Sequence, residues 1–353
     1  MPALPKTMKA AILTELRTPL VIAELTMPEA LSVGQVLVKI HYSGICGSQL
    51  GEIDGAKGED KFLPHLLGHE ASGTVIDIGP GVKHVNVGDK VVLHWRKGLG
   101  IESSPPRFTW QDRPVNAGWV TTFNEYAIVA ENRVTPIPPD SDLEVAALFG
   151  CAVTTGFGIV ENNAKVRIGE SVVVFGAGGI GLNIVQAAAL VSAYPVIAVD
   201  LHDNKLALAK QMGATHIINS ARGDTRNEIL DITGVAGADV FIDNTGQPAI
   251  IEMAYQITKP QGRVTLVGVP RKGCNINIYS LPLHFGKQIS GSHGGEAIPQ
   301  TDIPRYQRLY RAGRIHLREL ITARYSLENI NQAIADIRSG VIAGRCLVDM
   351  HST

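Results

Sequence analysis

The sequence predicts an α/β protein of two domains: a discontinuous β-domain and a doubly wound domain built on a parallel sheet of six strands. Three observations support this prediction. The 353 residues correspond to about two domains. The first third alternates β-type runs with turn residues, and from about residue 166 short apolar strands alternate with helical periods, as in βαβ units. We assign residues 1–152 and 296–353 to the β-domain and residues 153–295 to the doubly wound domain.

The β-domain is predicted from short runs of β-branched and apolar residues that Gly, Pro and Asn turns separate. Its expected strands are residues 9–13, 36–42, 73–78, 90–94 and 125–129. Near the end of the chain, apolar residues recur at helical spacing over residues 327–337, and a strand-like run follows at 346–350. We expect this last part to return to the β-domain, which is therefore discontinuous.

The doubly wound domain is predicted from six apolar strands. They are residues 171–175, 195–199, 216–218, 239–242, 263–267 and 288–290. The stretch 171–199 carries no charge and is long enough to span a bilayer. Four glycines interrupt it early and Pro195 interrupts it late, so a buried strand, a helix over 182–191 and a second buried strand explain it better. We expect no membrane span.

Composition narrows the function classes. The 32 Lys and Arg residues balance 33 Asp and Glu residues, so no basic field is available to hold a nucleic acid. Four cysteines are too few for a disulfide framework in a chain that can build its own core. The first residues lack the apolar run of a secretory signal. We therefore expect a cytoplasmic protein without nucleic-acid partners.

A glycine-rich motif follows the strand at 171–175 and opens the predicted helix. It consists of Gly176, Ala177, Gly178, Gly179, Ile180 and Gly181. In this G-x-G-x-x-G pattern the first glycine permits a tight turn, the second lets the backbone approach a pyrophosphate, and the third lets the helix contact the strand. The helix N-terminus then offers N–H groups to the phosphates. The motif in this context predicts a dinucleotide site.

Asp200 ends the next strand, 19 residues after Gly181. A carboxylate at this place accepts hydrogen bonds from the ribose hydroxyls of NAD and repels a 2′-phosphate. We therefore expect NAD. The preference over NADP is modest, because His202 and Lys205 lie close by in the sequence and tolerate a phosphate.

Two cysteines and a histidine form a candidate zinc site. Cys46, His69 and Cys151 supply two thiolates and one imidazole, and three protein ligands with one open position are typical of catalytic zinc. Each residue also has an ordinary explanation, since a lone buried Cys is usually a small apolar residue. Their distance in sequence does not by itself establish that they converge.

The combination of these motifs resembles the zinc-dependent medium-chain alcohol dehydrogenase family. The shared features are Cys46 within Gly-Ile-Cys-Gly-Ser, Gly68-His69-Glu70, Cys151 ahead of Thr154-Thr155-Gly156, and the later glycine motif, in this order. The resemblance implies a GroES-like catalytic domain joined to a Rossmann domain, with the active site in the cleft between them. It further implies hydride transfer between an alcohol and NAD, with an aldehyde or ketone as product, and a homodimer or homotetramer.

The resemblance also assigns roles to individual residues. It makes Cys46, His69 and Cys151 zinc ligands, with Glu70 beside the metal and able to bind it during ligand exchange, and Ser48 the hydroxyl that takes the substrate proton. On the cofactor side it implies contacts of Thr155 with the nicotinamide, of Asp200 and Lys205 with the adenosine ribose, of Val267 to Val269 with the carboxamide, and of Arg345 with the pyrophosphate. Trp95 matches an aromatic residue of the substrate pocket.

Three departures from the family pattern bear on the chemistry. No Cys lies between Trp95 and Trp119, where members often bind a structural zinc, so we predict one catalytic zinc per chain and no structural zinc. Gln49 stands where a carboxylate commonly steadies the zinc-bound His, so an amide oxygen or another acid must take this role. Gly51 stands where a His often ends the proton relay, which leaves a ribose hydroxyl, water or another His for that step.

Several alternatives stay open at this point. A zinc-free enone or quinone reductase of the same build would not need the Cys46, His69 and Cys151 set, and a non-enzymatic nucleotide-binding protein would retain the scaffold without turnover. The substrate is a secondary, cyclic or polyol-like alcohol in our preferred interpretation, and small primary alcohols and aminocyclitols also fit. Trp95 fits a pocket wall and a satellite core or subunit contact equally well.

Overall fold

The computed structural model describes residues 4–352 and divides the chain into two compact units. Unit 1 contains the chain up to Cys151, Ile298–Arg311 and the residues from Leu317 on, and unit 2 contains Ala152–Ala297 and Ala312–His316. We expected residues 1–152 and 296–353 in the β-domain, whereas Ala152, Glu296, Ala297 and Ala312–His316 group with unit 2. The backbone N–H of His316 donates to the Gln186 side chain in that unit, which accounts for the placement of Ala312–His316.

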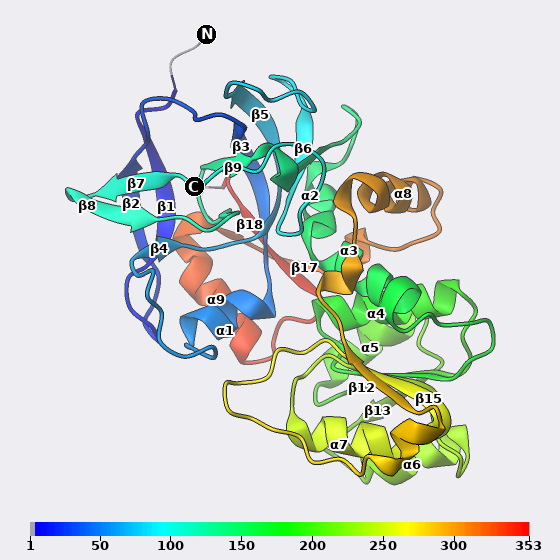
Figure 1. Cartoon of the computed structure of the whole chain (residues 1–353). Coiled ribbons are helices and arrows are strands. Elements are labelled where there is room, and N and C mark those ends of the chain that lie inside the picture. Colours follow the sequence, from blue (N-terminus) through cyan, green and yellow to red (C-terminus); the bar gives the residue numbers. More distant parts are fainter. Residues whose placement is uncertain (1–3, 353) are drawn as a thin grey trace. The chain divides into compact units, whose positions relative to one another are not determined.

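Unit 1 is built on two β-sheets (Figure 1). A closed barrel has the strand order β1 (Thr7–Leu13), β2 (Val21–Thr26), β7 (Arg107–Trp110), β8 (Arg113–Asn116) and β4 (His65–Leu66). A seven-stranded sheet has the order β10 (Val134–Pro136), β6 (Lys90–His94), β5 (Glu70–Ile78), β3 (Gln35–Ile45), β18 (Arg345–Asp349) and β17 (Ile321–Ser326), with β9 (Tyr126–Ala130) also on β3. The five strands expected in the first third of the chain are all present.

The C-terminal strand confirms that the β-domain is discontinuous. β18 pairs antiparallel with β3, with Cys346 opposite Ile45. The helix α9 (Ile330–Arg338) precedes it and buries Ile330, Ala333 and Ile334 in the same apolar core as α1 (Gly47–Ile53). The spacing of these residues is the helical period seen in the sequence. A strand and a helix from the end of the chain thus complete the domain that the first residues begin.

The region between Trp95 and Trp119, which we expected only as a lobe without a zinc site, contains a β-hairpin. β7 and β8 pair antiparallel, and Phe108 and Val115 lie fully buried opposite each other. The turn residues Gln111 and Asp112 both have positive φ, as the two central residues of a type I′ hairpin turn require. The hairpin lies between β2 and β4 in the barrel and so belongs to its wall.

Unit 2 is a parallel sheet of six strands with connecting helices (Figure 1). The strand order is β13 (His216–Asn219), β12 (Val196–Asp200), β11 (Val172–Phe175), β14 (Ala238–Asp243), β15 (Thr258–Leu266) and β16 (Gln288–Gly291). The connecting helices include α4 (Gly179–Leu190), α5 (Asp203–Gln211), α6 (Thr225–Thr233) and α7 (Pro248–Ile257). This order, with every neighbouring pair parallel, confirms the doubly wound sheet.

The uncharged stretch 171–199 is strand, helix and strand, as predicted. It comprises β11, α4 and most of β12, and the strands read as continuous apolar runs because helices cover both faces of a parallel sheet. Across the part of the chain that the structure describes, no single helix has the length and apolar character needed to cross a membrane. One bent pair, Leu143–Gly150 with Ala152–Asn163, meets the test by length and composition only.

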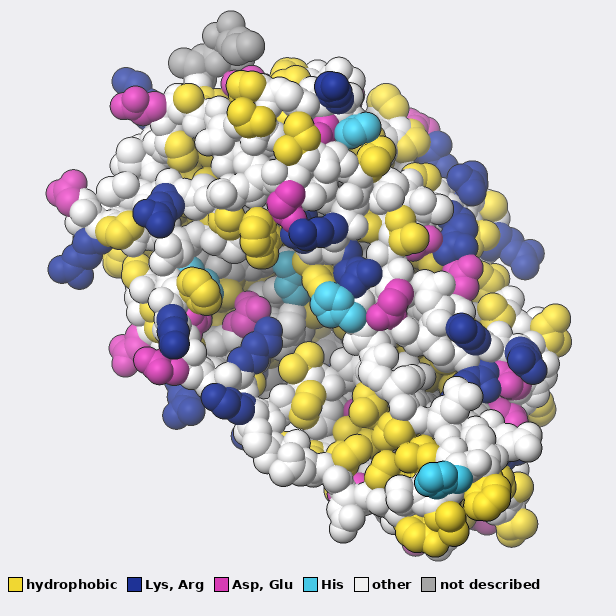
Figure 2. All heavy atoms as spheres, in the orientation of Figure 1, with side chains coloured by type: hydrophobic (Ala, Val, Ile, Leu, Met, Phe, Trp, Pro, Cys, Tyr) yellow, Lys and Arg dark blue, Asp and Glu magenta, His cyan; other side chains and the backbone are white. Residues whose placement is uncertain are grey.

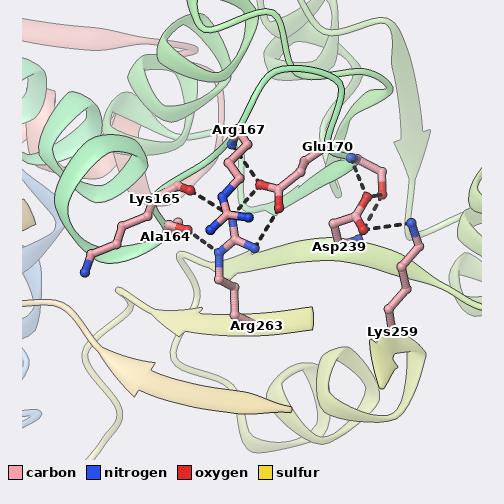
Figure 3. A network of polar contacts seen from close by, with 8 residues as sticks. Ala164, Lys165, Arg167, Glu170, Asp239, Lys259 and Arg263 are labelled. Atoms are coloured by element: carbon pink, nitrogen blue, oxygen red, sulfur yellow. Dashed lines mark hydrogen bonds and ion pairs between the residues drawn. The ribbon is translucent and has the colours of Figure 1, made fainter. Parts of the chain in front are cut away.

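A polar network fixes the entry to this sheet (Figure 3). Arg263 of β15 pairs with the Glu170 carboxylate, at 3.0 Å for the Nη1 to Oε1 contact, and donates to the carbonyl oxygens of Ala164 and Lys165. Asp239 accepts from the backbone N–H of Ser171 at 2.9 Å. These contacts hold the loop before β11 against the start of β14 and the later part of β15, so that β11 enters the sheet at a defined position.

Candidate active site

Cys46, His69 and Cys151 converge in unit 1. The two Sγ atoms and a ring nitrogen of His69 all lie within 4.8 Å of one another. Both cysteines are buried and His69 is half-buried. Among the described residues this is the one group of three or more His, Cys, Asp or Glu side chains that is close enough to hold a metal ion. The three residues that the sequence left separate are therefore brought together.

Local chain geometry explains why these residues meet. Cys46 follows the last residue of β3, and His69 precedes the first residue of its neighbour β5, so both lie at the same end of an antiparallel pair. Gly68 has a φ of +94°, and a Cβ there would lie 2.4 Å from the Thr122 hydroxyl. Only glycine allows this turn without strain, and the turn directs His69 toward Cys46.

The donor set fits zinc. Two thiolates and an imidazole are ligands that Zn²⁺ favours, and three of them leave a fourth position for another ligand. Among the residues that the structure describes, the buried Nε2 atom of His69 has no hydrogen-bond partner, as expected of a nitrogen that binds a metal. The contact with the Cys151 thiol and the nearby His69 hold the pKa of Cys46 well below its usual value, against the effect of burial. Cys46 therefore favours the thiolate form that a metal needs.

Glu70 lies next to this group and is paired with Arg345. Both side chains are almost fully buried. Two glycines make room for the carboxylate: a Cβ at Gly44 would lie 2.6 Å from its Oε1 atom, and one at Gly150 would lie 2.8 Å from its Cβ. Arg345, which the resemblance implied as a pyrophosphate contact, thus lies in unit 1 with a carboxylate partner. Its contact with a cofactor stays a prediction.

Gln49 contacts the metal ligand His69. Its Oε1 atom accepts from the backbone N–H of Cys46 at 2.9 Å, and its amide nitrogen contacts Nδ1 of His69. We expected an amide oxygen or another acid against His69. The oxygen instead completes the N-terminal cap of α1, in which Cys46 is the N-cap residue and Gln49 occupies the third helical position.

Ser48 and Trp95 are the remaining predicted residues of unit 1. The buried Oγ atom of Ser48 has no hydrogen-bond partner in residues 4–352, so it is available to a substrate hydroxyl. Trp95 follows His94, and His94 pairs with Glu70 in the ladder between β5 and β6. Trp95 therefore lies one residue beyond the end of this ladder. Its indole stacks with the Arg96 guanidinium at 5.7 Å from the ring centroid.

The glycine motif of unit 2 has the geometry of a phosphate-binding turn. Gly176 follows β11 with a φ of +95°, Gly178 is the N-cap of α4, and Gly179 and Ile180 form its first turn. A Cβ at Gly181 would lie 1.9 Å from the Gly176 carbonyl oxygen, whereas one at Gly178 would meet nothing within 4 Å. Gly181 is thus required by contact within the chain, and the space beside Gly178 is open at a helix N-terminus.

Asp200 ends β12 beside this turn. Its carboxylate accepts from the backbone N–H of Ala177 at 2.8 Å and of His202 at 3.0 Å, and Lys205 lies 4.0 Å from Oδ1. The acid therefore joins the glycine turn to the end of the next strand. Each carboxylate oxygen keeps a further lone pair for a hydroxyl donor.

The other predicted cofactor residues are spread over unit 2. Thr155 is buried in α3 (Ala152–Gly158), and Val267 follows β15, with its N–H donating to the Asp243 carbonyl at 2.8 Å. Val269 is exposed.

The sequence analysis did not identify Asp243, whose buried carboxylate accepts from Thr245 and Gly246 at the carboxyl end of β14. An acid directly after a buried parallel strand was the signal for it.

A second missed group lies in unit 1. Glu131, Asn132 and Arg133 are consecutive, buried and polar, and they hold the segment after β6. Glu131 accepts from the backbone N–H groups of Lys83 and His84 through Oε1, and from that of Ile101 through Oε2 at 2.9 Å. Burial by itself raises the pKa of Glu131, but these three N–H groups hold it below its usual value. Arg133 donates to the Trp95 carbonyl oxygen and stacks on Trp119.

Known proteins resemble the chain over most of its length. The alcohol dehydrogenase GroES-like domain matches residues 32–139, and the zinc-binding dehydrogenase family matches residues 179–311. The class-3 alcohol dehydrogenase of Cereibacter sphaeroides is 32% identical over 94% of this chain and 97% of its own length. The S-(hydroxymethyl)glutathione dehydrogenase of Paracoccus denitrificans is 32% identical, with the same coverage. The benzyl alcohol dehydrogenase structure from Acinetobacter calcoaceticus has a TM-score of 0.88 and 30% identity, over 98% of this chain and 99% of that one.

Proposed function

Because the chain belongs to the zinc-dependent medium-chain alcohol dehydrogenase family, we propose that it transfers a hydride between an alcohol and NAD and forms an aldehyde or ketone. The observation that carries this proposal is the convergence of Cys46, His69 and Cys151 within 4.8 Å, with the Nε2 atom of His69 buried and unpartnered. A zinc-free reductase that polarises its substrate by hydrogen bonds has no use for this set.

In this proposal the residues of unit 1 bind the metal and the alcohol. Cys46, His69 and Cys151 hold one zinc ion, which supplies a Lewis acid for the alcohol oxygen. The buried hydroxyl of Ser48 would accept the alcohol proton and pass its own proton on to a ribose hydroxyl, water or another His, and its oxygen has no hydrogen-bond partner among the described residues. Glu70, held by Arg345, is the acid available when ligands exchange at the fourth position. Trp95 forms a wall of the substrate pocket.

The residues of unit 2 bind and orient the cofactor. The open space at Gly178 and the N-terminus of α4 receive the pyrophosphate, and Asp200 accepts from the adenosine ribose with Lys205 beside it. Thr155, Val267 and Val269 contact the nicotinamide end, and NAD supplies the hydride acceptor. We propose NAD over NADP because a 2′-phosphate would meet the Asp200 carboxylate.

We propose one zinc per chain. Polar contacts of Glu131 and Arg133 hold the segment after Trp95, which has no cysteine up to Trp119. Elemental analysis of protein purified without chelators measures the stoichiometry. One zinc per chain supports the proposal, two would contradict the absence of a structural zinc, and none would favour the zinc-free reductase.

The substrate class is tested by an alcohol panel with NAD and with NADP, followed by the absorbance of the reduced cofactor. The panel includes secondary and cyclic alcohols, polyols, benzyl alcohol and S-(hydroxymethyl)glutathione, the last two because similar proteins are named for them. We expect turnover of secondary or cyclic alcohols with NAD. Bound zinc and tight NAD binding without turnover of any alcohol would support a non-enzymatic nucleotide-binding protein instead.

We propose that the chain forms a homodimer or homotetramer through unit 2. The edge strand β16 pairs only with β15 among the described strands. The segment between these strands exposes large apolar side chains, including Tyr279, Leu281 and Phe285, and Figure 2 shows apolar side chains gathered over this unit. Such an edge with apolar surroundings favours pairing with a second copy. Sedimentation velocity measures the state, and a monomer would overturn the proposal.

We also propose a reducing compartment, the cytoplasm, because Cys46 and Cys151 bind zinc as thiolates and not as a disulfide. None of the four cysteines forms a disulfide in the part of the chain that the structure describes. Recovery of zinc-free protein with a Cys46 to Cys151 disulfide from freshly lysed cells would contradict it.

A further inference from the structure

The amide of Gln49 lies between two parts of the proposed zinc site. Its oxygen accepts from the backbone N–H of Cys46 at 2.9 Å, and its nitrogen contacts Nδ1 of His69. The side chain is only 1% exposed, so water does not replace either contact. The orientation of this amide therefore affects a ligand side chain and the backbone of a second ligand.

The oxygen of this amide is committed to the helix cap. Cys46 is the N-cap residue of α1, and its N–H has Gln49 Oε1 as its partner. A buried backbone N–H without a partner is costly, so the cap favours the observed orientation of the amide. This orientation leaves the amide NH₂ group, which only donates, facing His69.

When His69 binds a metal, its Nδ1 atom needs a hydrogen-bond acceptor and not a donor. Nε2 is the buried, unpartnered ring nitrogen, so it is the atom that faces the metal position. A neutral imidazole that binds a metal through Nε2 carries its proton on Nδ1. That N–H then faces the N–H of the Gln49 amide, and two donors oppose each other.

Rotation of the amide does not remove the conflict. An oxygen turned toward His69 puts the NH₂ group against the Cys46 N–H. The amide has one acceptor atom, and the metal-bound site presents two N–H groups on its two sides. A carboxylate has two acceptor oxygens and satisfies both. Without metal, the observed amide satisfies both sides, because Nδ1 of His69 then accepts.

We propose that Gln49 is a positioning residue that favours the metal-free tautomer of His69, so that zinc is bound more weakly and exchanged faster than by the same three ligands with a carboxylate at position 49. This inference rests on the proposed function for the identity of the metal. Residues that orient a metal-bound His typically change metal affinity 10- to 100-fold. We expect an effect of about that size.

The test uses the isosteric substitution Gln49→Glu. It retains an oxygen for Cys46 and adds one for the Nδ1–H of His69. Competition with a chromophoric chelator at pH 7.5 measures the zinc dissociation constant, and release of zinc to excess chelator measures the exchange rate. We expect Gln49→Glu to bind zinc about 10- to 100-fold more tightly and to release it more slowly. The absorption spectrum of the Co²⁺ form shows whether the same ligands bind.

Gly47→Asp is the matched control for charge. It adds the same negative charge next to Cys46, at an exposed position where a side chain meets nothing within 4 Å. We expect less than about 3-fold tighter binding from this variant, because surface charges are screened. An equal gain from Gly47→Asp and Gln49→Glu would show that charge alone is responsible and would overturn the role of the amide.

A second variant keeps the test independent of how Gln49→Glu folds. Gln49→Met has similar length and neither donates nor accepts. It removes the hydrogen bond that stabilises the metal-free tautomer, so we expect zinc binding at least as tight as in the wild type. Weaker binding by Gln49→Met would mean that the amide assists the metal and would overturn the inference. A wild-type chain that binds no zinc would instead overturn the proposed function itself.

Discussion

The Glu70 carboxylate and the Arg345 guanidinium form an ion pair whose side chains are 0% and 4% exposed. By register, Arg345 of β18 lies opposite Cys46, because Cys346 pairs with Ile45. Glu70 directly follows His69. The pair therefore joins β18 to β5 across the intervening strand β3, next to the proposed ligands Cys46 and His69.

Removal of one member of this pair is expected to destabilise unit 1. Glu70→Gln leaves the Arg345 charge buried without its partner, which typically costs about 3–5 kcal/mol. The double variant Glu70→Gln with Arg345→Met should recover most of this loss, because no charge stays buried. Urea unfolding of the purified proteins measures the change.

The exposed pair of Lys9 and Glu328 is the control, with side chains 46% and 40% exposed. Glu328→Gln should change the free energy of unfolding by less than about 1 kcal/mol. If Glu70→Gln had an effect as small as that, the pair would not be a buried ion pair in solution.

Two glycines of the cofactor turn should respond differently to alanine. A Cβ at Gly181 collides with the Gly176 carbonyl oxygen at 1.9 Å, so Gly181→Ala should cost about 1–3 kcal/mol of stability. A Cβ at Gly178 meets nothing within 4 Å among the described residues, so Gly178→Ala should cost only the loss of a glycine N-cap, less than about 1 kcal/mol. It should still weaken NADH binding, because the methyl group fills the space that the pyrophosphate needs. Urea unfolding and NADH fluorescence titration separate the two effects, and full NADH binding by Gly178→Ala would contradict the proposed phosphate position.

The strand β11 could be predicted from the sequence because it is buried along its length. Val172, Val173 and Val174 of β11 are all fully buried, and such a run has a strong apolar signal. β2 and β7 were missed because their signal is weak. In β2 only Leu25 is buried, and in β7 only Phe108 is. These strands depend on closure of the barrel, which no local pattern reveals.

The metal ligands could be named from the sequence, but their neighbours could not. Cys46, His69 and Cys151 were recognised through a family resemblance, since their spacing alone does not bring them together. The pairing of Glu70 with Arg345 depends on the register of β18 on β3 and of β3 on β5. The direction of the Gln49 amide depends on the cap of α1. Both are set by contacts between segments, so only the structure shows them.

His94 should make the protein less stable in acid. Burial lowers the pKa of His94 to about 4 from its usual 6.5. The folded form therefore keeps this ring neutral, while the unfolded chain takes up a proton once the pH falls below about 6.5. Stability is lost as the pH falls from 6.5 to 4, by about 2 kcal/mol at pH 5.

His94→Gln removes this proton uptake and leaves an amide for Thr135, which contacts His94 at 2.9 Å. As the pH falls from 7.5 to 5, the wild type should therefore lose more unfolding free energy than His94→Gln does. His284→Gln, at an exposed ring, controls for the loss of a histidine. If the difference in unfolding free energy between variant and wild type did not change with pH, His94 would have the same pKa in the folded and unfolded states.

Hydrogen bonds of Glu131, and not a structural zinc, should hold the segment after β6 in position. Its two oxygens accept from three backbone N–H groups, and Glu131→Gln replaces one oxygen with a donor that faces an N–H. We expect a loss of about 1–3 kcal/mol and faster proteolysis within residues 96–106. Asp112→Asn makes the same chemical change at an exposed turn of the hairpin and should stay within about 0.5 kcal/mol of wild type. Because this segment needs no zinc, a chelator should not increase its proteolysis in the wild type, and cleavage there on zinc removal would contradict the single-zinc proposal.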